Sequence, residues 1–177
     1  KSNDREFIKK LAFLSYQSEV YQVRMYSVFL FGYLSEDKNI LMFLRDEVSK
    51  DSNWRVQEVL AKSFDEFCKI IGYEKALPVI DDWLKNSNHN TRRAVTEGLR
   101  IWTGRPYFKA NPNEAIRRLA ALRDDPSEYV RKSVGNALRD ISKKYPELIR
   151  VELSTWSLET KGIKQVYQLA NKLLIKS

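Results

Sequence analysis

The sequence has one cysteine and one histidine among its 177 residues. Cys68 cannot form a disulfide within the chain, which is typical of proteins of the reducing cytoplasm, and its apolar neighbours predict an inert buried thiol. His89 as the sole histidine excludes a histidine-rich metal site and makes a Ser-His-Asp triad improbable. We therefore expect a cytoplasmic protein without metal-dependent or serine-hydrolase chemistry.

The sequence also lacks a glycine-rich phosphate loop and any long hydrophobic run. Without the loop there is no sign of a nucleotide site, and we expect no cofactor. No stretch approaches the ~18 uncharged apolar residues that a membrane helix needs. The first residues, Lys1 to Glu6, show no apolar core behind a basic head, so no secretory signal is expected. The sequence therefore predicts no membrane association, and we expect a monomer.

The composition is 43% hydrophobic and 31% charged, with a net charge of +8. Such a chain is folded rather than disordered. An excess of positive charge favours a polyanionic partner, of which nucleic acid is the commonest. The alternative is a cytoplasmic protein that happens to be basic, and the location of the charge decides more than its sum.

Five segments repeat one pattern, a polar turn followed by a basic position and an apolar helical run. Their aligned positions are Arg24, Val56, Arg92, Arg131 and Lys164. The spacings of 32, 36, 39 and 33 residues lie near those of two-helix solenoid repeats. Val56 interrupts the basic column, and its neighbour Arg55 is a possible substitute.

Apolar residues recur at helical spacing throughout, and strand-like alternation is nowhere sustained. The fold class that we predict is an all-α, right-handed solenoid of about five HEAT-like repeats with a concave basic groove, forming a single domain over residues 1–177. Asp, Ser and Asn in the short turns are expected to cap the following helices. The one irregular stretch, from Thr103 to Asn113, is interpreted as an inserted loop and not as a domain boundary.

Equivalent positions of successive second helices line one surface of a helical-repeat stack, so a basic column predicts a stripe that neutralises phosphates. The stripe and its rim comprise Arg24, Arg55, Arg92, Arg93, Arg100, Arg105, Arg131, Lys132, Arg139, Lys143, Lys144 and Lys164. The alternative is that these arginines pair with acidic residues of the neighbouring repeat, for which Asp51 and Asp125 are well placed. Both interpretations can hold for different arginines.

Two groups of residues have the spacing of one helix face and could carry chemistry. Trp54 and Glu58 could provide an indole that stacks on a sugar or base and a carboxylate that stabilises a cationic transition state. The alternative is a core tryptophan beside a solvated glutamate. Arg93, Glu97 and Arg100 also share a face, which an intrahelical ion-pair ladder would explain.

The next repeat carries Asn136, Arg139 and Asp140, with Asn136 aligned to Glu97 and Ala61. A buried asparagine that contacts a neighbouring loop is the structural alternative for Asn136. The carboxylates of Glu58, Glu97 and Asp140 are too many for a purely phosphate-binding groove. They indicate a site in the groove that binds a positively charged group.

Three segments resemble the HEAT-like repeat DNA alkylation repair glycosylases, the AlkD/AlkC-like family. They are Trp54–Glu58, Arg92–Arg100 and Tyr129–Lys143, of which the third is the most specific. The repeat layout is similar over roughly residues 20–175. The resemblance implies double-stranded, alkylated DNA as partner and hydrolysis of the N-glycosidic bond of cationic N3- or N7-alkylated purines, without a metal or cofactor.

The resemblance also implies roles for single residues. Glu58 matches the catalytic carboxylate and Trp54 the aromatic beside it, while Glu97 and Asp140 match acidic positions of the AlkC-like motifs and Asn136 falls at a sugar-contacting position. The residues implied to contact DNA or shape the site are Arg55, Arg92, Arg93, Arg100, Arg131, Lys132, Arg139 and Lys143.

Some positions depart from the family pattern. Glu58 stands where the AlkD branch has aspartate, Asn136 stands where that branch has a second tryptophan, and Trp102 is near but not at an aromatic position of the AlkC branch. About 50 residues precede Trp54, fewer than in family enzymes, which predicts that N-terminal DNA-gripping helices are missing. A non-catalytic relative that binds DNA structures or acts as a protein scaffold is therefore the second hypothesis.

Overall fold

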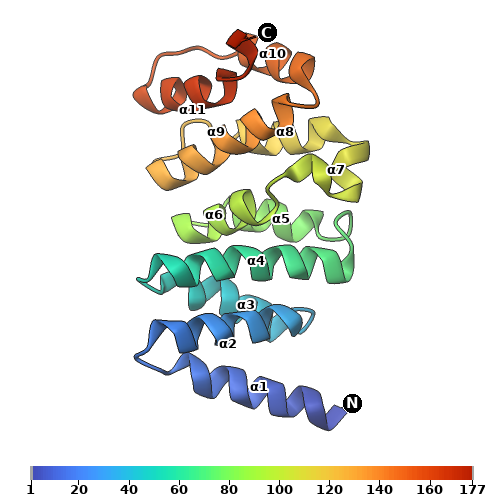
Figure 1. The fold of residues 1–177 in the computed structure, drawn as a ribbon, viewed down its shortest axis with the longest axis vertical. Helices are drawn as coiled ribbons and strands as arrows, with labels where there is room; N and C mark the ends of the chain where they lie inside the picture. The colour runs from blue at the N-terminus through green and yellow to red at the C-terminus, as the bar shows by residue number, and fades with distance from the viewer. Residues whose placement is uncertain (1, 177) are drawn as a thin grey trace. The chain divides into compact units, whose positions relative to one another are not determined.

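The structure is a computed structural model that describes residues 2–176, and the side chains of residues 4–175. Over this range it contains only helices and turns, which confirms the all-α prediction (Figure 1). Two compact units divide the chain, an N-terminal unit Lys1–Gly98 and a C-terminal unit Leu99–Ser177. No described helix is long and apolar enough to cross a membrane.

The N-terminal unit contains three helix pairs. Its elements are α1 (Ser2–Tyr16), α2 (Tyr21–Tyr33), α3 (Lys38–Asp46), η1 (Val48–Lys50), α4 (Trp54–Ile71), α5 (Leu77–Leu84) and α6 (His89–Gly98). The expected cap of α4 forms, since the Asn53 side chain accepts from the Arg55 amide, but Ser127 before α9 makes no side-chain cap bond. Pro78 lies in the first turn of α5. Buried apolar residues such as Phe31, Phe64 and Trp83 fill the space between the pairs.

The C-terminal unit contains two further pairs. Its elements are η2 (Trp102–Gly104), α7 (Pro106–Ala110), α8 (Pro112–Ala120), α9 (Glu128–Ser142), α10 (Pro146–Ser154), α11 (Lys161–Asn171) and η3 (Leu174–Lys176). The stretch predicted as an inserted loop is mostly helical, because Pro106 and Pro112 each occupy a first-turn position that suits proline. The boundary between the two units falls just before it, at Gly98.

The helices α4 and α6 of the N-terminal unit approach each other closely. At Gly98 of α6, an added Cβ would overlap the backbone carbonyl oxygen of Ala61 in α4. This approach requires glycine, and it sets the distance between the two helices that carry Glu58 and Arg93.

We expect Gly98→Ala to lower the free energy of unfolding by about 1–3 kcal/mol, because α6 must move away from α4 to admit the methyl group. Urea unfolding followed by circular dichroism measures the loss. Gly104→Ala is the matched control, since a Cβ there meets nothing within 4 Å. Equal stability of the two variants would contradict the close packing of α6 on α4.

Candidate functional site

The fourth residue of the second helix is a recurring position in all five helix pairs. It is occupied by Arg24, Gln57, Arg92, Arg131 and Lys164. The three arginines make the same contacts: each Nη1 donates to the carbonyl oxygens five and six residues earlier, at 2.7 to 3.1 Å. Gln57 reaches the equivalent oxygen of Asp51 at 2.7 Å with its side-chain amide. The residue in register is therefore Gln57, and the prediction that Val56 or Arg55 fills this position is wrong.

Arg24 also connects one repeat to the next through an ion pair with Asp51, as the alternative predicted. Arg131 instead binds the backbone carbonyl of Asp125 and reaches the next repeat through a neutral amide. Arg24 binds Asp51 through Nε–Oδ2 and Nη2–Oδ1 contacts of 2.6 and 3.2 Å. The hydrogen bond to Asp51 raises the pKa of Arg24, so the pair stays charged. In the C-terminal unit, Nε of Arg131 donates to Oε1 of Gln165 at 2.9 Å.

Two of the predicted DNA contacts, Arg92 and Arg131, have a structural role instead of, or in addition to, a contact with DNA. Arg92 is only 7% exposed, and its guanidinium is bound to the turn before α6. We therefore withdraw Arg92 as a phosphate contact. Arg131 is half-buried and holds the turn before α9, so a DNA contact there remains a prediction for its exposed part only.

An exposed aromatic and basic cluster lies where α4 begins. Trp54 is 62% exposed, so the alternative of a core tryptophan is wrong. The Arg55 guanidinium lies over the Trp54 ring at 4.4 Å and near the Tyr21 ring of α2 at 5.4 Å. A flat cation between two rings is a surface on which a sugar or base can stack.

Glu58 lies one turn further along α4 and is paired across helices. Its Oε1 accepts from Nη2 of Arg93 on α6 at 2.5 Å, with the glutamate side chain 40% and the arginine 19% exposed. The glutamate is therefore part-exposed and ion-paired at once. Glu97 follows Arg93 by one turn of α6 and is half-buried. The N-terminal unit thus brings together Trp54, Arg55, Glu58 and Arg93 of the predicted site.

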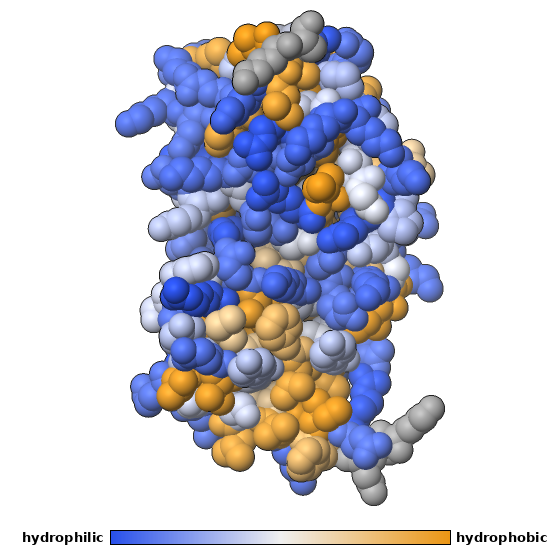
Figure 2. All heavy atoms as spheres, in the orientation of Figure 1, coloured by the Kyte–Doolittle hydropathy of each residue, from blue (hydrophilic) through white to orange (hydrophobic). Residues whose placement is uncertain are grey.

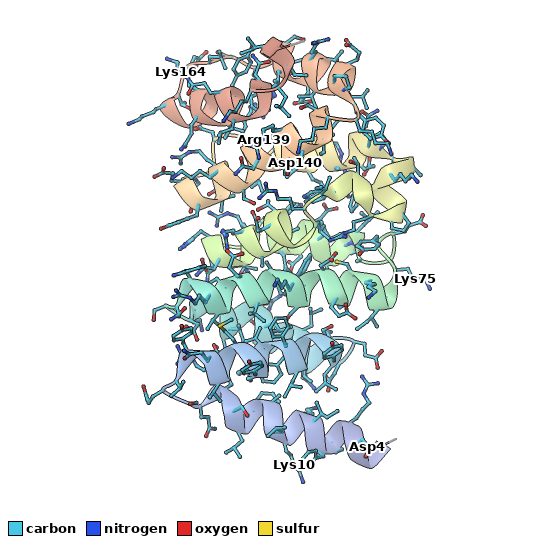
Figure 3. All side chains as sticks on the ribbon, in the orientation of Figure 1. Asp4, Lys10, Lys75, Arg139, Asp140 and Lys164 are labelled. Carbon is cyan, nitrogen blue, oxygen red and sulfur yellow. The ribbon has the colours of Figure 1, made fainter. Side chains whose placement is uncertain are left out.

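A second cluster of predicted residues surrounds Asp140 in α9. Its carboxylate, 6% exposed, accepts from Nε of Arg100 at 2.9 Å and from Nζ of Lys143 at 3.0 Å. Arg139 approaches to 3.9 Å, and Figure 3 shows it beside Asp140 on the same helix. Burial is the strongest single influence on the Asp140 pKa and raises it, but the bonds from Arg100 and Lys143 together outweigh burial, so the pKa lies below its ordinary value.

The remaining predicted residues of the C-terminal unit surround this cluster. Asn136 is half-buried one turn before Asp140, and exposed Lys132 pairs with Glu128 at 2.7 Å. Counted from the start of each helix, Asn136 is equivalent to Glu97 and to Lys62, so the alignment with Ala61 is one residue out. Trp102 is fully buried against Phe108 and belongs to the core.

The predicted site residues therefore form two clusters, one in each unit. Sequence reasoning missed Tyr21 as a partner of Arg55, and Gln57 as a member of the recurring column. The position of each turn relative to its helix would have identified Gln57. Within residues 4–175, no group of three His, Cys, Asp or Glu side chains could hold a metal ion.

Similar proteins of known structure share this architecture. AlkD2 from Streptococcus mutans is 77% identical, with a TM-score of 0.94 over 94% of this chain and 81% of its own. The alkylpurine DNA glycosylase AlkC from Pseudomonas fluorescens, bound to DNA containing an abasic site analog, is 25% identical with a TM-score of 0.60, over 90% of this chain and 49% of AlkC.

The sequence comparisons agree with the structural ones. The uncharacterized protein YhaZ of Bacillus subtilis is 36% identical over 91 residues, which are 49% of this chain and 26% of YhaZ. The chain therefore spans about a quarter of that relative. The family described as DNA alkylation repair enzyme matches residues 1–155. Since this match covers most of the sequence, the chain belongs to the family of DNA alkylation repair enzymes.

Proposed function

We propose that this chain binds double-stranded DNA and hydrolyses the N-glycosidic bond of purines alkylated at N3 or N7. The observation that carries the proposal is the arrangement at the start of α4. Exposed Trp54 lies one helical turn from Glu58, with Arg55 and Arg93 on either side. An aromatic surface, a carboxylate and two cations are the groups that a reacting, positively charged nucleotide requires.

The chemistry proposed for this arrangement needs no cofactor. The alkylated purine carries a positive charge and leaves as a neutral base when the bond to the sugar breaks. Positive charge then develops on the deoxyribose, where the Glu58 carboxylate stabilises it. Water adds to the sugar carbon and releases a proton, which leaves an abasic site. Trp54 is proposed to contact the sugar, and Arg93 to hold the Glu58 carboxylate in place.

Phosphates are proposed to contact the exposed cations near the two clusters. Arg55, Lys132 and Lys143 are exposed, and Arg93 and Arg139 are part-buried. The DNA-bound state of AlkC supports DNA as the partner. We expect the affinity for duplex DNA to fall steeply as salt rises, because each neutralised phosphate releases counterions. A cytoplasmic location remains part of the proposal.

The test is release of the base from duplex DNA that contains N7- or N3-methylpurines. We expect release by the wild type and about a 100-fold lower rate with Glu58→Gln, because the variant loses the charge that stabilises the sugar cation. Glu66→Gln, on the same helix, is the matched control and is expected to keep full activity. No release by the wild type would overturn the enzymatic part of the proposal.

A non-catalytic DNA-binding protein is the second candidate, and the Glu58–Arg93 pair favours it. At 2.5 Å the guanidinium already neutralises much of the carboxylate charge that a sugar cation would need. For this candidate we expect salt-dependent DNA binding that Glu58→Gln leaves unchanged, without base release. No DNA binding even at low salt would instead favour a protein scaffold.

A further inference from the structure

An exposed row of aromatic side chains runs along α2 and has no role in the function proposed above. Tyr26, Phe29 and Tyr33 are separated by three and four residues, so they lie on one face of the helix. Their exposed fractions are 71%, 37% and 66%. We call these three residues the aromatic row. Single exposed apolar residues are common, but three aromatic rings on one helical face indicate a binding surface.

The charges around the aromatic row are suited to a polyanion. The helix α2 contains no aspartate or glutamate, and Nζ of Lys62 on α4 lies 5.8 Å from the centre of the Phe29 ring. At the start of the same two helices, the Arg55 guanidinium lies near the Tyr21 ring in the same way. Cations of α4 therefore lie beside rings of α2 at two places along the helix pair.

Hydrophobic residues also lie on the first helix pair. Figure 2 shows residues of high hydropathy, among more polar ones, gathered over α1 and α2 of the N-terminal unit. On α1, the side chains of Phe7, Leu11 and Leu14 add to this surface at helical spacing. Aliphatic contacts of α1 do not distinguish one apolar ligand from another, but exposed rings next to cations do, because each base has an aromatic face and each nucleotide carries a phosphate.

We propose that the aromatic row and Lys62 form a binding site for unpaired nucleotides of a DNA strand, in addition to the duplex contacts. The bases would stack on Tyr26, Phe29 and Tyr33, and Lys62 would neutralise a phosphate. Along the helix axis the Cα atoms of the three residues are ~4.5 and ~6 Å apart, given the rise of about 1.5 Å per residue, so one short segment of strand can reach all three. The choice of DNA as the ligand rests on the proposed function.

The test compares two strands of the same length and charge. One is a fluorescein-labelled oligothymidylate of about 12 nucleotides, and the other is a strand of abasic tetrahydrofuran phosphates. We expect the full-length protein to bind the oligothymidylate at least about tenfold more tightly in an anisotropy titration, because only that strand can stack. Equal affinity for the two strands would overturn the proposal.

Single substitutions locate the site. Tyr26→Ala and Tyr33→Ala are each expected to lower the affinity for oligothymidylate roughly tenfold, and Lys62→Gln to reduce its salt dependence. Tyr129→Ala is the matched control, because Tyr129 is an exposed ring (68%) on α9 of the C-terminal unit, outside the aromatic row. An equal loss with Tyr129→Ala would overturn the proposal and indicate non-specific apolar adsorption.

Other outcomes separate this proposal from the previous one. Binding of methylated duplex but not of oligothymidylate would overturn only the aromatic-row site. Stacking-dependent binding of oligothymidylate without affinity for duplex would instead support the site and contradict the duplex-binding function. Sedimentation of the protein alone provides a further check: self-association that Tyr26→Ala abolishes would overturn the proposal in favour of a second copy of this chain.

Discussion

Replacing Arg24 by methionine is expected to lower the free energy of unfolding by about 3–5 kcal/mol. The Asp51 side chain is only 4% exposed, and Arg24 binds both of its oxygens. The same guanidinium donates to the carbonyl oxygens of Ser18 and Glu19. The methionine fills similar space but leaves the buried carboxylate with the Asn53 amide alone as donor, and it leaves two carbonyl groups without the guanidinium. Urea unfolding of the protein, followed by circular dichroism, measures the loss.

Lys164 provides a matched control for this prediction. It occupies the same position of α11 that Arg24 occupies in α2, yet its side chain is exposed (Figure 3). We therefore expect Lys164→Met to change stability by no more than about 0.5 kcal/mol. If both variants lost the same unfolding free energy, the bonds from Arg24 to Asp51 and to the turn would not be the cause of the loss.

The repeat pattern was predictable from sequence because it depends on contacts that lie close together along the chain. The carbonyl groups that Arg24, Arg92 and Arg131 bind lie five and six residues earlier, within the same turn. The exchange of arginine for Gln57 was not predictable from charge, because a neutral amide donates to the same carbonyl. Polar turn contacts, more than positive charge, define the position.

The site was predictable only in part. Spacing places Trp54 and Glu58 on one helix face, but it does not say which residue of another helix meets them. The partner of Glu58 is Arg93, 35 residues away, and the partner of Asp140 is Arg100, 40 residues away. The first pair joins α4 to α6, and the second joins the segment after α6 to α9, so both depend on tertiary packing that local periodicity does not determine.

The ion-pair interpretation is therefore confirmed for Arg24, and the phosphate-binding interpretation stays a prediction for the exposed arginines. Arg24 and Arg92 each hold a turn, and part-buried Arg24 also joins one repeat to the next. Arg55 is exposed and lies over aromatic rings, where it remains available to a ligand. The net charge of +8 thus overstates the charge that can face DNA, because part of it is used inside the fold.

The second large effect is expected from Arg100→Met, which should lower stability by about 3 kcal/mol at neutral pH. In the variant, the buried Asp140 carboxylate keeps only two cationic partners. They are Lys143, whose side chain is 57% exposed, and Arg139 at 3.9 Å. Because the fold then holds a buried carboxylate that has lost its main partner, the ionised form becomes costly. Lys143→Met is the control and should cost less than about 1 kcal/mol, since exposed ion pairs contribute little.

The pH dependence of this loss tests its cause. The pKa of Asp140 is lowered in the folded protein, so the ion pair stabilises the fold fully above the unfolded pKa of about 3.9. This stabilisation is lost as the pH falls through the lowered folded pKa. The difference in unfolding free energy between the wild type and Arg100→Met should therefore be largest near neutral pH and shrink below about pH 4. A difference that stays constant from pH 7 to pH 3 would show that Arg100 stabilises the C-terminal unit by packing and not through the charge of Asp140.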